Sequence, residues 1–294
     1  MANHKFYPLN QSPLYALSSK RRMAKILGAP LERIRILSSP NFYNEFSTAK
    51  GREVQEPKPE LKRIHRRIKT LLCRISPPPY LFSGVQGKGY IDNARYHQKN
   101  THFLTTDIKT FYPSCKEIYV HKAFIMDFKM PPDVAGFLAR LVTFNGIIPT
   151  GSPTSQILSY FAYSRTFDKL AKIAAESNMQ FSLYVDDITF SSPKKIRKSF
   201  FTQIRHELNK VDLRLHAKKT RSYGASQYKK ITGCAISPDG KLLAPNKLMK
   251  KIIDGLDALK KQPDEKIKNT VLGQIRSARN IQPGLFESVM ARSK

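Results

Sequence analysis

The stretch Phe181–Phe190 constrains the fold most, because it places two adjacent acids between two runs of alternating apolar residues. Successive side chains of a strand point to opposite faces, so a period of two predicts strands with one buried face. Asp186 and Asp187 interrupt this pattern, and aspartate tolerates the backbone angles of a turn. The stretch therefore predicts a β-hairpin with the two acids at its tip. An ordinary hairpin with a polar turn explains the same pattern.

A second acid, Asp107, follows an apolar strand pattern upstream, and Tyr112 follows it five positions later. Asp107 and Asp186 are 79 positions apart (186 − 107), so only folding can bring them together. Carboxylates at converging strand ends would form an oxygen-rich site suited to Mg²⁺, a hard ion held by carboxylates and substrate phosphates. Two such ions about 4 Å apart activate the attacking oxygen and stabilise the leaving one in phosphoryl transfer.

The charge balance indicates a polyanionic partner. The chain has 51 Lys and Arg against 22 Asp and Glu, a net charge of +29. A surplus of this size on a folded protein favours nucleic acid as the partner, although a generally basic soluble protein is the alternative. Residues 60–75 predict a helix whose polar face is almost entirely positive, and we expect RNA contacts from Lys62, Arg63, Arg66 and Arg67. A solvated helix face is the alternative there.

The remaining composition predicts a globular protein of the cytoplasm. Its 294 residues are 40% hydrophobic, enough for a core, and no run of about 18 apolar residues predicts a membrane span. The first residues lack the apolar segment of a signal peptide. Cys73, Cys115 and Cys234 are far apart and odd in number, which suits a reducing compartment. Residues 1–48 read as helices and loops and indicate no activity.

Five short motifs in order resemble those of reverse transcriptases. The Asp107 strand, Pro149–Ser155 and Tyr184–Asp187 resemble the family's motifs A, B and C. Asn93–His97 resembles the NAxxH signature of bacterial retron reverse transcriptases, and Ile231–Gly233 resembles their VTG signature with isoleucine in place of valine. The resemblance runs from about residue 50 to the C-terminus. Each motif is weak alone, and the five together in this order are specific.

The resemblance implies an α+β fold of the right-hand polymerase type. It implies N-terminal helices and fingers at 1–105, and a palm of antiparallel sheet backed by helices at 106–235. Further finger helices are expected near 116–145, and a small basic helical thumb at 236–294. A thumb of this kind could grip a duplex by its backbone and its A-form shape.

The resemblance also implies roles at the reaction centre. Asp107 and Asp186 would ligate two Mg²⁺ ions, with Asp187 beside them adding charge or a further ligand. A lysine of motif D would protonate the leaving pyrophosphate. Lys219 matches that position, and its neighbour Lys218 stays an alternative.

For the incoming dNTP, the resemblance implies contacts from the fingers and the palm. Arg52 would meet the triphosphate, with Lys50 beside it, and Ile108 would offer its backbone carbonyl. Tyr112 would lie under the sugar and exclude a 2′-hydroxyl, unless it is simply a core tyrosine. Gly151 would let the backbone approach the nascent base pair closely.

For the RNA, the resemblance assigns the two retron signatures. Asn93 and His97 would help to organise the fingers and palm against a cognate RNA, and Thr232 and Gly233 would contact it. Asn93 could instead cap a helix. His97 lacks a second ligand at helical spacing, which argues against a metal site.

The implied function is that of a retron enzyme. It would copy its own structured non-coding RNA into branched multicopy single-stranded DNA (msDNA) from dNTPs. It would act in antiphage defence in the bacterial cytoplasm, with a separate effector protein and no membrane partner. Two alternatives stay open: a reverse transcriptase of the group II intron type, and a catalytically idle RNA-binding scaffold on the same fold.

Overall fold

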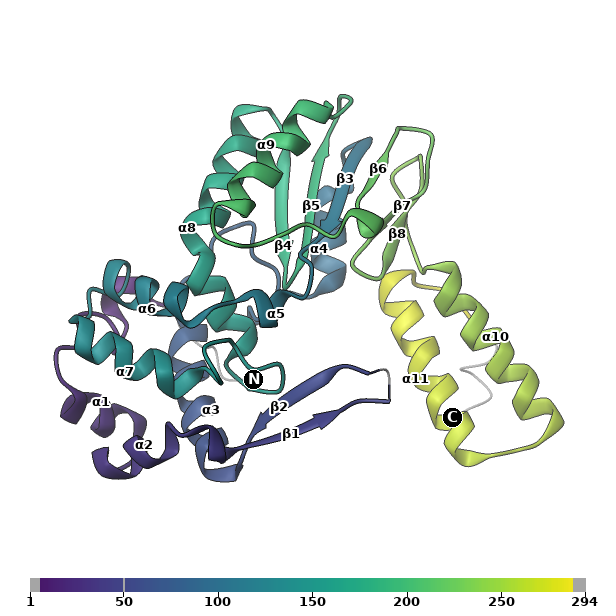
Figure 1. The fold of residues 1–294 in the computed structure, drawn as a ribbon. Coiled ribbons are helices and arrows are strands. Elements are labelled where there is room, and N and C mark those ends of the chain that lie inside the picture. Colours follow the sequence, from purple (N-terminus) through teal and green to yellow (C-terminus); the bar gives the residue numbers. More distant parts are fainter. Residues whose placement is uncertain (1–5, 50, 288–294) are drawn as a thin grey trace.

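A four-stranded antiparallel sheet lies at the centre of the computed structural model (Figure 1). Its strands follow the order β4 (Gln180–Tyr184), β5 (Asp187–Ser192), β3 (His102–Asp107) and β6 (Arg221–Tyr223). The predicted hairpin is present as β4 and β5. Only Val185 and Asp186 form its turn, whereas Asp187 is already the first residue of β5, because it pairs with Tyr184 across the hairpin.

Two smaller antiparallel sheets flank this sheet along the chain. The first is a hairpin of β1 (Tyr43–Ser47) and β2 (Glu53–Pro57). The second contains β7 (Lys229–Ile231), β8 (Cys234–Ile236) and β9 (Leu242–Leu243). In Figure 1 the β1–β2 hairpin runs below the turn between β4 and β5, and the β7–β8–β9 sheet leads to the last two helices.

Helices make up most of the remaining fold. In chain order they are α1 (Lys20–Leu27), α2 (Leu31–Leu37), α3 (Pro59–Cys73), α4 (Tyr90–His97), α5 (Phe111–Ser114), α6 (Glu117–Met126), α7 (Pro132–Val142), α8 (Ser155–Glu176), α9 (Lys198–Asn209), α10 (Asn246–Lys261) and α11 (Glu265–Ile281). Short 3₁₀ turns are η1 (Leu9–Gln11), η2 (Pro40–Phe42) and η3 (Ala217–Lys219). The structure describes residues 6–49 and 51–287, so Lys50, expected beside Arg52, lies outside the described residues.

The helix predictions from apolar spacing are confirmed. The helix expected over residues 60–75 is α3, which buries its apolar stripe, including Leu61, Ile64 and Ile68. The helices expected near 116–145 are α6 and α7, and Pro132 opens α7, where a missing N–H is tolerated. No helix among the described residues is long and apolar enough to cross a membrane.

The principal core joins the N-terminal helices to the central sheet. It runs from Leu14 through the buried faces of α3, α6, α7 and α8 to Phe181 and Phe190 in the sheet. A second cluster packs Ala94 of α4 and Phe103 of β3 against β7 and β8. A third lies between α10 and α11, where a Cβ on Gly255 would come within 2.4 Å of Val271. The last two helices therefore pack closely at a glycine.

Candidate active site

The register of the central sheet brings the predicted acids together. Asp107, the last residue of β3, pairs directly with Asp187, the first residue of β5. Residues opposite each other in an antiparallel pair hold their Cβ atoms about 5 Å apart. Asp186 is adjacent in the turn, and its carbonyl accepts a hydrogen bond from the N–H of Ile108 at 3.0 Å. Three carboxylates from distant parts of the chain thus share one end of the sheet.

The turn that carries Asp186 has an unusual backbone. Val185 has a φ of 59°, whereas Asp186 is not among the residues with positive φ. Positive φ at only the first of two turn residues is the pattern of a type II′ turn, which normally places glycine there. A β-branched residue in this region is strained. The turn is anchored by Ser83, whose hydroxyl oxygen accepts a hydrogen bond from the Val185 N–H at 2.9 Å.

The electrostatics of the site favour added positive charge. Burial raises the pKa of Asp187 to about 6, and the nearby charges of Asp186 and Asp107 act in the same direction. Burial, followed by the charge of Asp107, also raises the pKa of Asp186. The ammonium of Lys219 donates to both oxygens of Asp107, at 2.6 and 2.8 Å. Hydrogen bonding to Asp107 in turn raises the pKa of Lys219.

The donor set has the chemistry that suits a divalent cation. Carboxylate oxygens are the ligands that Mg²⁺ prefers. A cation here would relieve the repulsion that raises the pKa values of Asp186 and Asp187. Within the described ranges, no three His, Cys, Asp or Glu side chains are already grouped as metal ligands. Asp107 is paired with Lys219 instead.

A cavity of about 660 Å³ opens beside the carboxylates. Arg52, at the start of β2, and Tyr112, on α5, line it together with the three acids and Lys219. Burial, followed by the charge of Asp186, raises the pKa of Tyr112 to about 12, so the phenol stays neutral at physiological pH. Ile108 also lines the cavity, but its side chain is fully buried, which leaves only its backbone for contacts.

The glutamates near Arg52 do not pair with it. Glu53 accepts a hydrogen bond from the hydroxyl of Ser47, and Glu56 pairs with Lys62. Arg52 has no ion pair among the described residues. Its guanidinium is therefore available to an anion in the cavity.

Gly151 has a different neighbour from the one expected. Its N–H donates to the carbonyl of Gln55 in β2 at 3.1 Å. A Cβ on Gly151 would lie 2.8 Å from that carbonyl oxygen and 2.8 Å from a methyl of Val54. The missing side chain therefore makes room for strand β2. The expected close approach of the Gly151 backbone to a base pair stays a prediction.

A buried histidine fixes the loop that contains Gly151, and the sequence interpretation missed it. The Nε2 atom of His65 lies 2.8 Å from the carbonyl of Leu141, which can only accept, so Nε2 carries the proton. Nδ1 therefore accepts from the Ser152 hydroxyl at 2.6 Å. Burial lowers the pKa of His65 to about 4, which keeps this neutral tautomer. Its place in the apolar stripe of α3, beside Ile64, was the signal available in the sequence.

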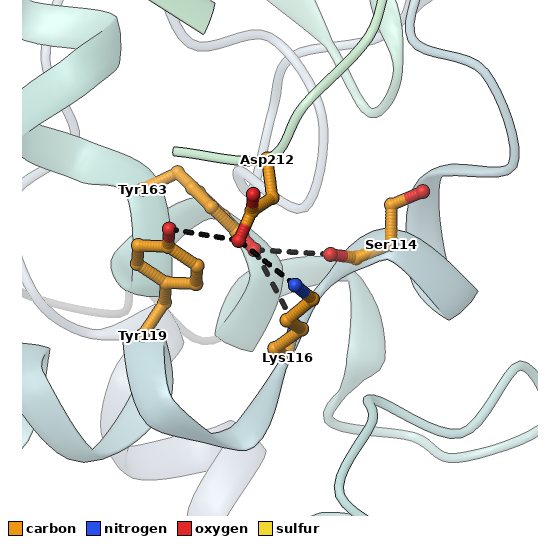
Figure 2. A network of polar contacts seen from close by, with 5 residues as sticks. All are labelled: Ser114, Lys116, Tyr119, Tyr163 and Asp212. Carbon is orange, nitrogen blue, oxygen red and sulfur yellow. Dashed lines mark hydrogen bonds and ion pairs between the residues drawn. The ribbon is translucent and has the colours of Figure 1, made fainter. Parts of the chain in front are cut away.

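The loop that leads to Lys219 is held by a polar network (Figure 2). Asp212 has a φ of 62° and accepts from the Lys116 ammonium at 2.9 Å and from the Tyr119 hydroxyl at 3.2 Å. The Tyr163 hydroxyl donates to the carbonyl of Ser114 at 3.2 Å in the same network. The contacts of Asp212 tie the loop after α9 to the start of α6. The contact of Tyr163 ties the end of α5 to α8.

The structure separates the two candidate lysines. Lys219 reaches Asp107, whereas Lys218 is exposed and makes no ion pair within residues 6–49 and 51–287. The backbone reinforces this arrangement, because the N–H of His216 donates to the carbonyl of Asp107 at 2.7 Å. The geometry favours Lys219 as the lysine of the site.

The basic residues of α3 differ in availability. Arg63 and Arg66 are exposed and make no ion pair among the described residues. Lys62 is paired with Glu56, and Arg67 donates to the carbonyl of Ile26 at 3.1 Å. Arg63 and Arg66 are thus the members of the predicted RNA-contacting face with free charges.

The two retron signatures differ in exposure. The side chains of Asn93 and His97 are fully buried, so they do not contact RNA directly, and the organising role that the resemblance implies stays a prediction. Asn93 donates to the Thr232 hydroxyl at 2.8 Å. Thr232 and Gly233 line a second cavity, of about 410 Å³, which Asp107 and Asp187 also line. Only the second signature therefore reaches the surface beside the acids.

Comparison with known proteins finds similarity to reverse transcriptases. A family model described as reverse transcriptase (RNA-dependent DNA polymerase) matches residues 48–236. The retron Se72 reverse transcriptase of Salmonella heidelberg is 30% identical over 201 residues, which cover 66% of this chain and 53% of that protein. The retron Mx162 reverse transcriptase of Myxococcus xanthus is 23% identical over 270 residues, 78% of this chain and 55% of that protein. The chain spans about half the length of these curated relatives.

A solved structure shares the architecture. Apo telomerase from Candida tropicalis, truncated from its C-terminal domain, superposes with a TM-score of 0.51 at 12% sequence identity. The match covers 70% of this chain and 56% of that chain. Likeness at this identity concerns the fold, and it confirms the expected α+β right-hand polymerase architecture.

Proposed function

Because this chain belongs to the reverse transcriptase family, we propose that it is an RNA-directed DNA polymerase. The observation that carries the proposal is the pairing of Asp107 with Asp187, with Asp186 in the adjoining turn. Arg52 and Tyr112 line the same cavity as these acids. One cavity thus combines carboxylates for metal ions, a cation for a triphosphate and an aromatic ring for a sugar.

The three acids would hold two Mg²⁺ ions, which when bound activate the primer hydroxyl and stabilise the leaving pyrophosphate. Arg52 binds the triphosphate of the incoming dNTP, for which a guanidinium is well suited. Lys219 leaves Asp107 and holds a proton toward the pyrophosphate as a general acid. The ion pair between Lys219 and Asp107 keeps the lysine protonated and within the site before substrate binds.

Tyr112 supplies selection between sugars. Its half-buried ring lines the cavity beside Asp186, and the adjoining Phe111 is buried in the core. The centroids of the two rings are 5.6 Å apart, so packing against Phe111 restricts the movement of the Tyr112 ring. We assign it to the exclusion of rNTPs, by contact with the 2′ position.

The relatives are named as retron reverse transcriptases, which supports a retron assignment for this chain. We propose that the chain copies a cognate structured non-coding RNA into branched msDNA in the bacterial cytoplasm, in antiphage defence with a separate effector protein. Arg63 and Arg66 on α3 and the surface at Thr232 and Gly233 are the proposed RNA contacts.

The proposed division of the chain follows the same architecture, with fingers at 1–105, palm at 106–235 and thumb at 236–294. One refinement comes from the small sheet. The boundary at 235/236 lies within β8, which pairs with both β7 and β9. We therefore propose that the thumb proper begins with α10, after Pro245.

The test uses the protein expressed with its native upstream locus. The protein is purified, its bound nucleic acid is extracted, and the extract is treated with RNase, DNase and debranching enzyme. A short RNase-resistant DNA that shifts on debranching supports the retron assignment. Its absence, with activity retained on a generic primed RNA, indicates a reverse transcriptase of another lineage, such as the group II intron type.

The control is Asp187→Asn, which removes one carboxylate without removing volume. It should yield the bound RNA without the DNA, because RNA binding does not depend on the acids. Absence of DNA from both proteins, with RNA bound equally, would indicate an RNA-binding scaffold. Loss of RNA from the variant would contradict the separation of binding from chemistry.

A further inference from the structure

One stripe of helix α4 contacts three separate parts of the fold. Tyr90, Asn93 and His97 are spaced by three and then four residues, which places them along one face of a helix. Asn93 and His97 are fully buried. Each of the three makes a polar contact that is distant in sequence, and none of these contacts belongs to the reaction centre itself.

At one end of the stripe, His97 joins the two strands of the catalytic hairpin. Its Nε2 lies 2.7 Å from the hydroxyl of Ser182 in β4, and its Nδ1 lies 2.7 Å from the hydroxyl of Ser191 in β5. Burial lowers the pKa of His97 to about 3, so the ring is neutral, with one donating and one accepting nitrogen. Both nitrogens are therefore used, one on each strand.

At the other end, the stripe contacts the turn between β7 and β8 and also helix α11. Asn93 donates to Thr232, whose φ is 41°, and Gly233 follows with a φ of 84°. Positive φ at both positions is what a type I′ turn between β7 and β8 requires. This backbone conformation is strained for a β-branched threonine, so the turn benefits from an anchor. The hydroxyls of Tyr90 and Ser277, on α11, lie 3.3 Å apart.

Stability alone does not explain why the buried residues of this stripe are polar. The Oδ1 atom of Asn93 is buried and has no hydrogen-bond partner among the described residues. Leaving such an atom unpaired is destabilising, and an apolar side chain would avoid that cost. Buried polar contacts of this kind specify one relative placement of the elements that they join.

We propose that α4 sets the position of the α10–α11 helices relative to the catalytic turn, with Asn93 and His97 as positioning residues. The helices and the turn are joined through one rigid helix of eight residues. On the proposed function, a primer–template duplex lies against both, and its end must meet the acids. A shift of the helices should weaken binding of the duplex, whereas a shift of about 1 Å in the turn that carries Asp186 can cost about a hundredfold in rate.

The first test measures the placement directly, without any assay of activity. Spin labels are attached at Lys172 on α8 and Lys260 on α10, whose side chains are 77% and 78% exposed. Cys73→Ser removes the partly buried thiol; the other two cysteines are buried. Pulsed dipolar spectroscopy then gives the distance distribution between the labels.

Asn93→Ala should broaden that distribution, and Thr232→Val should do the same, because each removes one side of a single hydrogen bond. Thr232→Ser keeps the hydroxyl and should keep the wild-type distribution. Arg95→Ala changes an exposed side chain of α4 and serves as the matched control. Wild-type distributions in both Asn93→Ala and Thr232→Val would overturn the proposal.

The second test rests on the proposed function and separates the two ends of the stripe. Asn93→Ala should weaken primer–template binding by up to about tenfold, the effect of one hydrogen bond, with the single-turnover rate at saturation largely kept. His97→Gln should lower the single-turnover rate while the template affinity stays unchanged. If both variants only lower the yield of folded protein, with normal constants per active site, the role is structural and the proposal is wrong.

Discussion

Asp187→Asn should abolish DNA synthesis and, in the absence of divalent metal, stabilise the fold. The stabilisation is expected because folding raises the pKa of Asp187 to about 6, from an ordinary value of 3.8. A carboxyl group whose pKa is raised by folding contributes stability that is fully present below its unfolded pKa. That contribution is lost as the pH rises through the folded pKa. Asparagine cannot ionise, so the variant does not lose it.

The size of the effect follows from the shift. A difference of about two pKa units corresponds to about 3 kcal/mol of unfolding free energy, which is an upper figure because the site is partly open to solvent. The gain should therefore be about 1–3 kcal/mol above pH 7, decline between about pH 6 and pH 4, and vanish below that. Mg²⁺ should reduce or reverse this difference in stability between the variant and the wild-type protein, because metal binding to the native site stabilises the wild type.

The assay is denaturant unfolding of both proteins at pH 8 and at pH 5, in chelator and in Mg²⁺. Asp212→Asn is the matched control, because its hydrogen bond to Lys116 lowers the pKa of Asp212, so that this carboxylate contributes stability when ionised. At pH 8 in chelator, Asp212→Asn should therefore lower the denaturant midpoint of unfolding, whereas Asp187→Asn should raise it. A variant at 187 that is no more stable than wild type at pH 8 in chelator would refute the electrostatic reasoning.

Three further predictions concern the cavity. Tyr112→Ala should raise the incorporation of rNTPs relative to dNTPs, and unchanged discrimination in steady-state kinetics would remove its assignment as the sugar gate. Lys219→Ala should slow nucleotide addition by about a hundredfold or more, with a much smaller loss in Lys218→Ala, and equal losses in rapid-quench kinetics would contradict the choice of Lys219. Gly151→Ala should cost about 1–3 kcal/mol of stability, because its methyl group would lie 2.8 Å from the Gln55 carbonyl; an unchanged melting midpoint would contradict this.

The sequence predicted most of the framework of the site. Alternating apolar residues around Asp186 and before Asp107 define strand ends, and strand ends in one antiparallel sheet bring such acids into register. The apolar spacing of residues 60–75 also predicted helix α3. These features are local, and each is determined by residues within about ten positions.

What the sequence did not predict depends on partners far along the chain. The hydrogen bonds of His65 to Ser152 and of His97 to Ser191 span 87 and 94 positions, and no local pattern specifies them. The resemblance favoured Lys219 and left Lys218 as an alternative, whereas the course of the loop brings Lys219 to Asp107. The resemblance gave Asn93 and His97 only a general organising role, because a motif gives residue types without giving their burial or their hydrogen-bond partners.

The central claim is tested most directly by primer extension on a defined RNA template, with purified protein, dNTPs and Mg²⁺. The wild-type protein should extend the primer in a manner that depends on template sequence and on Mg²⁺, and Asp187→Asn should not extend it while still binding the template. Extension by the variant at the wild-type rate, or none by the wild-type protein on either a generic or its cognate RNA, would contradict the account.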